Sequence, residues 1–157
     1  MLSCKKDSDT TRVRINLTDA PAEYDEVNVD IREVNIKTDG DTSGWVSVPT
    51  KAGIYNLLEY QDGVDTLIAE ALLTGNAIKE IRLVLGDDNT IKKDGESFPL
   101  TIPSGSESGL KIKLQQALSG GIADVTLDFD AALSVKSEES GYKLRPVVKI
   151  LPWIYTL

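Results

Sequence analysis

Apolar and polar residues alternate with a period of two along most of this chain, which is the pattern of β-strands that bury one face. Near the amino terminus, Val13, Ile15 and Leu17 alternate with polar residues. The alternation resumes at Val27 and slips at Arg32, which predicts a bulge or a change of strand there. Clusters of Gly, Pro, Asp and Ser separate the apolar stretches about every 8–12 residues. The pattern therefore predicts a chain built mainly of short strands.

One segment departs from this alternation. The stretch from Asp65 to Leu73 is rich in good helix formers. Asp65 is a residue type that caps the first turn of a helix, and Gly75 is a residue type that ends one. The sequence therefore predicts a short helix over residues 65–73.

Short strands with one small helix, and no alternation of strands with helices, indicate an all-β fold. We predict an antiparallel β-sandwich of about seven to nine strands. No repeat or linker divides the chain, so residues 12–157 are expected to form a single domain. Residues 1–11 are expected to be a lipoprotein terminus and flexible tether, because Lys5 to Thr11 contains no apolar residue.

The amino-terminal segment contains the single cysteine of the chain. Cys4 follows Ser3 and an apolar pair, and this resembles the end of a bacterial lipoprotein signal peptide. In that chemistry the cysteine is acylated and becomes the first residue of the mature chain. We therefore expect lipidation at Cys4 and a lipid-anchored, surface-exposed protein of the bacterial outer membrane. The alternative is an ordinary free cysteine in a frayed terminus.

Composition narrows the chemistry further. The 157 residues include no histidine, which excludes Ser-His-Asp and Cys-His catalysis and histidine zinc sites. A single cysteine allows neither an internal disulfide nor a thiolate metal cluster. The net charge is −8, and an acidic surface repels phosphate backbones, so nucleic acid is not an expected partner.

Seven sequence blocks, in their order and spacing, resemble DUF4382, a domain-of-unknown-function family of bacterial envelope proteins. The resemblance runs from about Val13 to Ile150, and it implies a lipoprotein or secreted β-sandwich with no established activity. The blocks are Leu17-Thr18-Asp19-Ala20-Pro21, Gly44-Trp45-Val46, Tyr55-Asn56-Leu57-Leu58, Ile81-Arg82-Leu83-Val84-Leu85, Leu100-Thr101-Ile102-Pro103-Ser104-Gly105, Leu127-Asp128-Phe129-Asp130-Ala131 and Leu144-Arg145-Pro146-Val147.

The resemblance also singles out individual residues. Asp19, Pro21, Asp128 and Asp130 occupy family-motif positions. Asn56 stands where the family is expected to have an acidic residue, which weakens any role for an essential carboxylate at that position.

A turn cluster matches the first half of a calcium-binding loop. Asp39, Asp41 and Ser43 supply oxygens at loop positions one, three and five, and Gly44 provides the sharp turn at position six. Thr50 replaces the bidentate acid at position twelve. The alternatives are therefore a weak calcium site and a plain hairpin turn.

Two acids lie on one predicted strand. Asp128 and Asp130 are two residues apart, so both side chains point to the same face of the strand. Such a pair can act in glycoside hydrolysis or form half of a metal site. The alternative, which we favour, is that they lie at a solvated strand end or accept backbone N–H bonds at a turn. Asp19, two residues before Pro21, is likewise expected to form a local turn.

Aromatic side chains offer the flat apolar faces that stack on sugar rings. Trp153 and Tyr155, near the carboxyl end, are the expected exposed pair. Most other aromatic residues should belong to the core or its rim. They include Trp45, Tyr55, Tyr60 and Tyr142.

Together these features favour a non-catalytic envelope lipoprotein that binds a glycan or a partner protein or serves in assembly. No catalytic residue and no cofactor is expected, apart from the calcium hypothesis at Asp39. The alternatives are an enzyme that acts on saccharides through Asp128 and Asp130, and a calcium-binding structural spacer.

Overall fold

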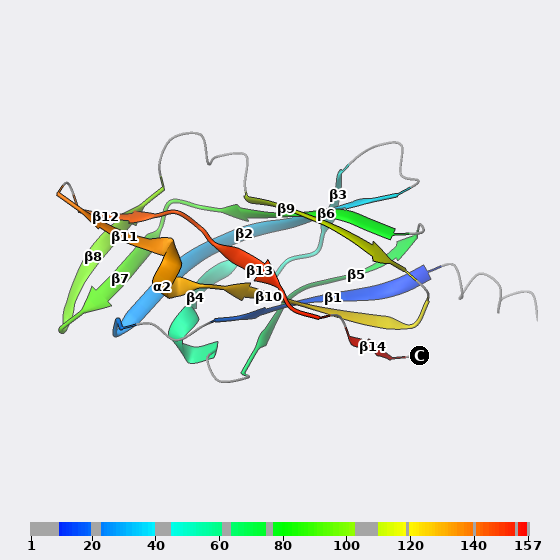
Figure 1. Cartoon of the computed structure of the whole chain (residues 1–157), viewed down its shortest axis with the longest axis horizontal. Coiled ribbons are helices and arrows are strands. Elements are labelled where there is room, and N and C mark those ends of the chain that lie inside the picture. Colours follow the sequence, from blue (N-terminus) through cyan, green and yellow to red (C-terminus); the bar gives the residue numbers. More distant parts are fainter. Residues whose placement is uncertain are drawn as a thin grey trace, which may run out of the picture.

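The chain folds into two β-sheets that enclose one hydrophobic core (Figure 1). The computed structural model describes residues 10–19, 23–39, 45–60, 64–74, 77–102, 110–118, 120–139, 141–152 and 154–156. The core draws on both sheets, since Val13 and Phe129 of one sheet and Val34 and Leu83 of the other are fully buried. The predicted all-β fold is therefore confirmed, with two open sheets in a sandwich.

The smaller sheet has five strands in the order β13-β10-β1-β5, with β14 also paired to β10. Its strands are β1 (Thr10–Thr18), β5 (Thr66–Thr74), β10 (Ile122–Phe129), β13 (Val148–Ile150) and β14 (Ile154–Thr156). β1 begins at Thr10, and Thr11 is buried, so these two residues belong to the sheet rather than to a tether.

The larger sheet has nine strands, and its main path is β11-β12-β8-β7-β2-β6-β9. Its strands are β2 (Glu26–Thr38), β3 (Trp45–Val48), β4 (Gly53–Asn56), β6 (Ala77–Leu85), β7 (Asn89–Lys93), β8 (Glu96–Thr101), β9 (Leu110–Ala117), β11 (Val135–Glu138) and β12 (Gly141–Leu144). The single α-helix of the described residues is α2 (Ala131–Ser134), and a 3₁₀ turn, η1, spans Leu57–Tyr60.

The helix predicted over residues 65–73 is wrong. This segment is β5, which pairs antiparallel with β1 at the edge of the smaller sheet. Helix propensity is a weak preference, and the ladder with β1 together with burial of Ile68 and Leu73 outweighs it. The short helix lies instead at α2.

Two further details differ from the sequence prediction. The described residues form fourteen strands, because long apolar stretches are broken into shorter paired segments. Two pairings, β1 with β10 and β8 with β12, are parallel rather than antiparallel. The bulge predicted at Arg32 is confirmed, since the register between β2 and β6 shifts between Ile31 and Glu33.

The bulge in β2 coincides with breaks in the strands on both of its edges. β6 and β7 follow one another along one edge, and β3 and β4 follow along the other. Side chains that lie at these breaks complete the ladder. The Asp30 N–H donates to Asn89 Oδ1 at 2.8 Å, and the Val34 N–H donates to Thr50 Oγ1 at 3.0 Å.

Asn56 has a similar structural role. Its Oδ1 accepts from the Val27 N–H at 3.1 Å and from the Leu58 N–H at 3.2 Å. A carboxylate oxygen could accept the same two bonds, so an acidic residue at this position would also serve as a backbone acceptor.

Candidate functional site

The structure brings three of the four family-motif residues to one end of the smaller sheet. β1 and β10 run parallel, and Thr18 pairs with Asp128. Asp19 and Asp130, which directly follow these two strands, therefore lie at the same end of the sheet. The helix α2 begins directly after Asp130. Pro21 lies outside the described residues.

Two of these acids hold the helix. Asp130 caps α2, because its Oδ1 accepts from the Leu133 N–H at 3.0 Å. Asp19 is buried, and its Oδ1 accepts from the Ala131 N–H at 2.9 Å. Asp19 thus contacts a segment 112 residues later in the chain. The local turn predicted for Asp19 does not account for this contact. Both carboxylates satisfy backbone donors at the first turn of α2, where such donors have no partner within the helix.

Asp128 has a different environment from the other two. Its Oδ1 is buried and has no hydrogen-bond partner in the part of the chain that the structure describes. Burial raises the pKa of Asp128 above its ordinary value of 3.8, the charge of Asp130 raises it further, and Lys149 opposes the shift. A carboxyl group with a raised pKa can act as a general acid, so the setting of Asp128 is chemically unusual.

This setting predicts a pH-dependent effect of Asp128→Asn. When a carboxyl group has a higher pKa in the folded state, both states are protonated below the unfolded pKa, and stability is lost as the pH rises through the folded pKa. The variant lacks this loss, so at pH 7 we expect its melting temperature to be about 1–3 °C above that of the wild type. The difference should close as the pH falls toward 3.8.

Thermal unfolding followed by circular dichroism from about pH 3.5, near the ordinary carboxyl pKa, to about pH 8, where carboxyl groups are ordinarily ionised, tests this expectation. The matched control is Asp65→Asn, since Asp65 is exposed and precedes β5. A variant at Asp128 that is less stable than the wild type at pH 7 would show that the ionised carboxylate stabilises the fold.

The predicted calcium loop is only partly described. Asp39 is half-buried, and its N–H donates to the Ala77 carbonyl at 2.8 Å. Asp41 and Ser43 lie outside the described residues. Within the described ranges, no group of three or more acidic, cysteine or histidine side chains is arranged to hold a metal ion.

The remaining predicted residues cannot be placed as side chains. Cys4 and Trp153 lie outside the described residues, and only the backbone of Tyr155 is described, paired with Ala123 in β10.

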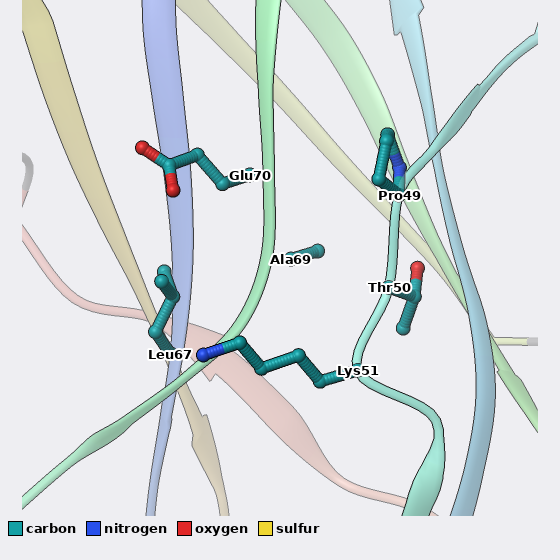
Figure 2. Close-up of a pocket in the computed structure, with 6 residues that line it drawn as sticks. All are labelled: Pro49, Thr50, Lys51, Leu67, Ala69 and Glu70. Carbon is teal, nitrogen blue, oxygen red and sulfur yellow. The ribbon is translucent and has the colours of Figure 1, made fainter.

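One pocket lies where the two sheets meet (Figure 2). Its volume is about 260 Å³, and it lies between the β3–β4 connection and the edge of β5. The Lys51 N–H donates to the Ile68 carbonyl at 2.7 Å, and the Glu70 N–H donates to the Pro49 carbonyl at 3.3 Å. Figure 2 shows the Lys51 side chain extending toward Leu67. These backbone bonds join the two sheets, so the residues that line this pocket have a structural role. The lining residues are Pro49, Thr50, Lys51, Leu67, Ala69 and Glu70.

A larger pocket of about 430 Å³ lies at the tip formed by β8, β11 and β12. The rings of Phe98 and Tyr142 are 5.2 Å apart and tilted by 49°, a favourable arrangement for an aromatic pair. Beside them, Lys143 Nζ donates to Thr101 Oγ1 at 3.1 Å, and Glu138 faces Arg145 at 3.6 Å. We call this the tip pocket. It is lined by Phe98, Pro99, Thr101, Ser137, Glu138, Glu139, Gly141, Tyr142 and Lys143.

Comparison with known proteins identifies the family. The model of DUF4382, a domain of unknown function, matches residues 10–146. The chain belongs to the DUF4382 family. Neither a curated protein nor a solved structure matches it.

The DUF4382 match begins with β1 and ends just after β12, so it includes the three described motif acids and the tip pocket. β13 and β14, which complete the smaller sheet, lie beyond it. No helix in the described part of this DUF4382 protein is long and apolar enough to cross a membrane.

Sequence reasoning did not identify the tip pocket of this DUF4382 domain. Tyr142 is one of several aromatic residues predicted for the core or its rim, and it does pack against the core, partly buried, while also lining the tip pocket. Phe98 and Tyr142 are far apart in sequence and meet because β8 and β12 pair in parallel. The local signal in the sequence was an aromatic residue, Tyr142, between Gly141 and Lys143 in a short strand.

Proposed function

We propose that this DUF4382 protein is a non-catalytic binding module of the bacterial cell envelope that recognises a saccharide at the tip pocket. The tip pocket carries this proposal. An aromatic ring offers an apolar face to the C–H groups of a sugar, and adjacent polar groups bind its hydroxyls. Tyr142 and Phe98 supply the rings, and Lys143, Thr101 and Glu138 supply the polar groups.

The position of the tip pocket suits a protein anchored through an acylated Cys4. β1 begins at one end of the sandwich, whereas β8, β11 and β12 form the opposite end (Figure 1). A lipid anchor that precedes β1 would therefore direct the pocket away from the membrane. One acyl chain binds a membrane only marginally, so stable anchoring needs the several chains that lipoproteins carry.

The roles of the motif acids support a binding function over catalysis. Glycoside hydrolysis ordinarily uses two carboxyl groups. Asp130 and Asp19 instead accept backbone N–H bonds from α2. The raised pKa of Asp128 is the observation that favours the alternative, a saccharide-acting enzyme, and the test must therefore separate binding from turnover.

The test is a glycan-array screen followed by titration calorimetry of the best ligand. We expect Tyr142→Ala to weaken binding by about two- to tenfold, because a stacked aromatic contact is worth roughly 0.5–1.5 kcal/mol. The matched control is Tyr60→Ala, which removes a half-buried ring that contacts Tyr55 and lies outside the tip pocket.

Equal binding by the wild type and Tyr142→Ala, with Tyr60→Ala also unchanged, would contradict the tip pocket as the binding site. Release of a product that is abolished by Asp128→Asn would establish the enzyme instead.

A further inference from the structure

The outer face of the larger sheet carries a cluster of basic side chains around a tryptophan. The cluster spans four neighbouring strands, β3, β2, β6 and β9, and we call it the basic face. Its members are Lys37, Trp45, Glu80, Arg82, Lys111 and Lys113.

Strand register places these residues in two adjacent rows. In one row, Lys37 pairs with Trp45 on one side and with Glu80 on the other, and Glu80 pairs with Lys113. In the second row, Arg82 pairs with Lys111. Paired residues point to the same face of a sheet, and the rows are two residues apart along each strand, or about 6.8 Å.

The basic face points away from the core. Ile36 and Ile81, which lie between the two rows on their strands, are fully buried. Side chains alternate between the two faces of a strand, so the rows on either side point outward. Lys111 and Lys113 are exposed, and Trp45 and Arg82 are half-buried.

Among the described residues, the positive charges of the basic face exceed the negative ones. Four cations accompany one anion, Glu80, in a chain whose net charge is −8. Within the described ranges, none of the four cations forms an ion pair. The guanidinium of Arg82 lies 4.8 Å from the centre of the Trp45 ring, which holds the cation in place without cancelling its charge.

The shape and surroundings of this face distinguish between anionic ligands. It spans four strands at about 4.8 Å spacing, so it is roughly 15 Å wide. A thin extended polymer fits within this width. A membrane or a DNA duplex would extend over the acidic remainder of the surface and be repelled, since charges interact over a Debye length of about 8 Å.

The apolar residues point to the same choice. Docking to a bilayer normally buries apolar side chains in the interface. None of the described large hydrophobic residues that are exposed lies on β2, β3, β6 or β9. These residues are Ile54, Val64, Leu72, Leu133 and Ile154.

We propose that the basic face binds a linear acidic polysaccharide. The carboxylates of the polymer pair with Lys111, Lys113 and Arg82, and Trp45 fixes the Arg82 guanidinium against the sheet. This site is separate from the tip pocket and does not depend on the function proposed there.

The experiment measures binding of the full chain to polygalacturonate by biolayer interferometry, with neutral dextran as the uncharged polymer. We expect binding to polygalacturonate only, and we expect it to fall steeply as the salt concentration rises. Lys111→Glu/Lys113→Glu should weaken it by at least about tenfold, because each reversal turns an attraction into a repulsion.

The matched control is Lys93→Glu/Lys136→Glu, which makes the same change in net charge at two exposed lysines on β7 and β11. It should retain the wild-type affinity within about twofold, and circular dichroism of both double variants confirms folding. Trp45→Ala should weaken binding less than the double reversal does, since it frees Arg82 but retains its charge. Tyr142→Ala should have no effect.

Several results would overturn the proposal. Equal binding by Lys111→Glu/Lys113→Glu and the wild type would exclude the basic face as the binding site. Equal weakening by the control variant would show that net charge alone explains the effect. Binding to phosphatidylglycerol vesicles or to duplex DNA in place of polygalacturonate would identify a different anionic partner. Equal binding to dextran and to polygalacturonate would show that binding does not depend on the charge of the polymer.

Discussion

Replacing Gly86 with alanine is expected to lower the free energy of unfolding by roughly 3–5 kcal/mol. Gly86 lies between β6 and β7, beside the bulge of β2. A Cβ atom at this position would lie 2.3 Å from Asp30 Oδ2 and 2.4 Å from Arg32 Nε, far closer than atoms in contact allow. The substitution must therefore displace a group that the surrounding structure holds in place.

Asp30 cannot move aside without further loss. Its carboxylate is buried, and Arg32 binds both of its oxygens, at 2.9 and 3.0 Å. The Asp88 N–H donates to the same carboxylate, and the Gly86 N–H donates to the Asp30 carbonyl at 2.8 Å. A buried carboxylate that loses these partners is strongly destabilising, which sets the size of the expected effect.

Urea unfolding of Gly86→Ala measures the loss, and Gly53→Ala is the matched control. A Cβ atom at Gly53 meets no atom within 4 Å, so this control should change stability by no more than about 1 kcal/mol. In an Arg32→Ala background the loss caused by Gly86→Ala should shrink, since one of the two contacts is gone. Equal stability of Gly86→Ala and Gly53→Ala would show that the loop has room for a side chain.

The strands were predictable because their signal is local. Val13, Ile15 and Leu17 alternate with polar residues, and all three are fully buried in the core. The slip at Arg32 was also visible, since a bulge changes the order of residues along one strand. The cap formed by Asp130 is also a local feature, because its acceptor and donor are three residues apart.

Other features depend on pairing between distant residues. The stretch from Asp65 to Leu73 has helix-forming composition, and only its ladder with β1 makes it a strand. The Gly86–Asp30 contact joins the β6–β7 connection to β2, and neither residue has an unusual local pattern. The tip pocket likewise forms only when β8 and β12 pair. Such contacts arise from topology, which the period of a single strand does not encode.

The contact between Asp19 and α2 is the long-range feature with the next largest expected effect. Asp19→Ala should lower the free energy of unfolding by roughly 2–3 kcal/mol, because it leaves the N–H of buried Ala131 without its acceptor at the point where α2 begins. Asp19→Asn retains an acceptor oxygen, so its loss should be smaller. Urea unfolding of the two variants measures the difference.

The matched control for this prediction is Asp130→Ala at the same helix. Asp130 caps an exposed turn, so its loss should cost only about 1 kcal/mol. If Asp19→Ala were as stable as the wild type, the buried contact would contribute nothing to folding, and this motif acid would be free for a chemical role. If the expected order holds, Asp19→Ala most costly and Asp130→Ala least, the acids at family-motif positions stabilise the junction of β1, β10 and α2. That outcome would direct the search for ligands to the tip pocket and the basic face.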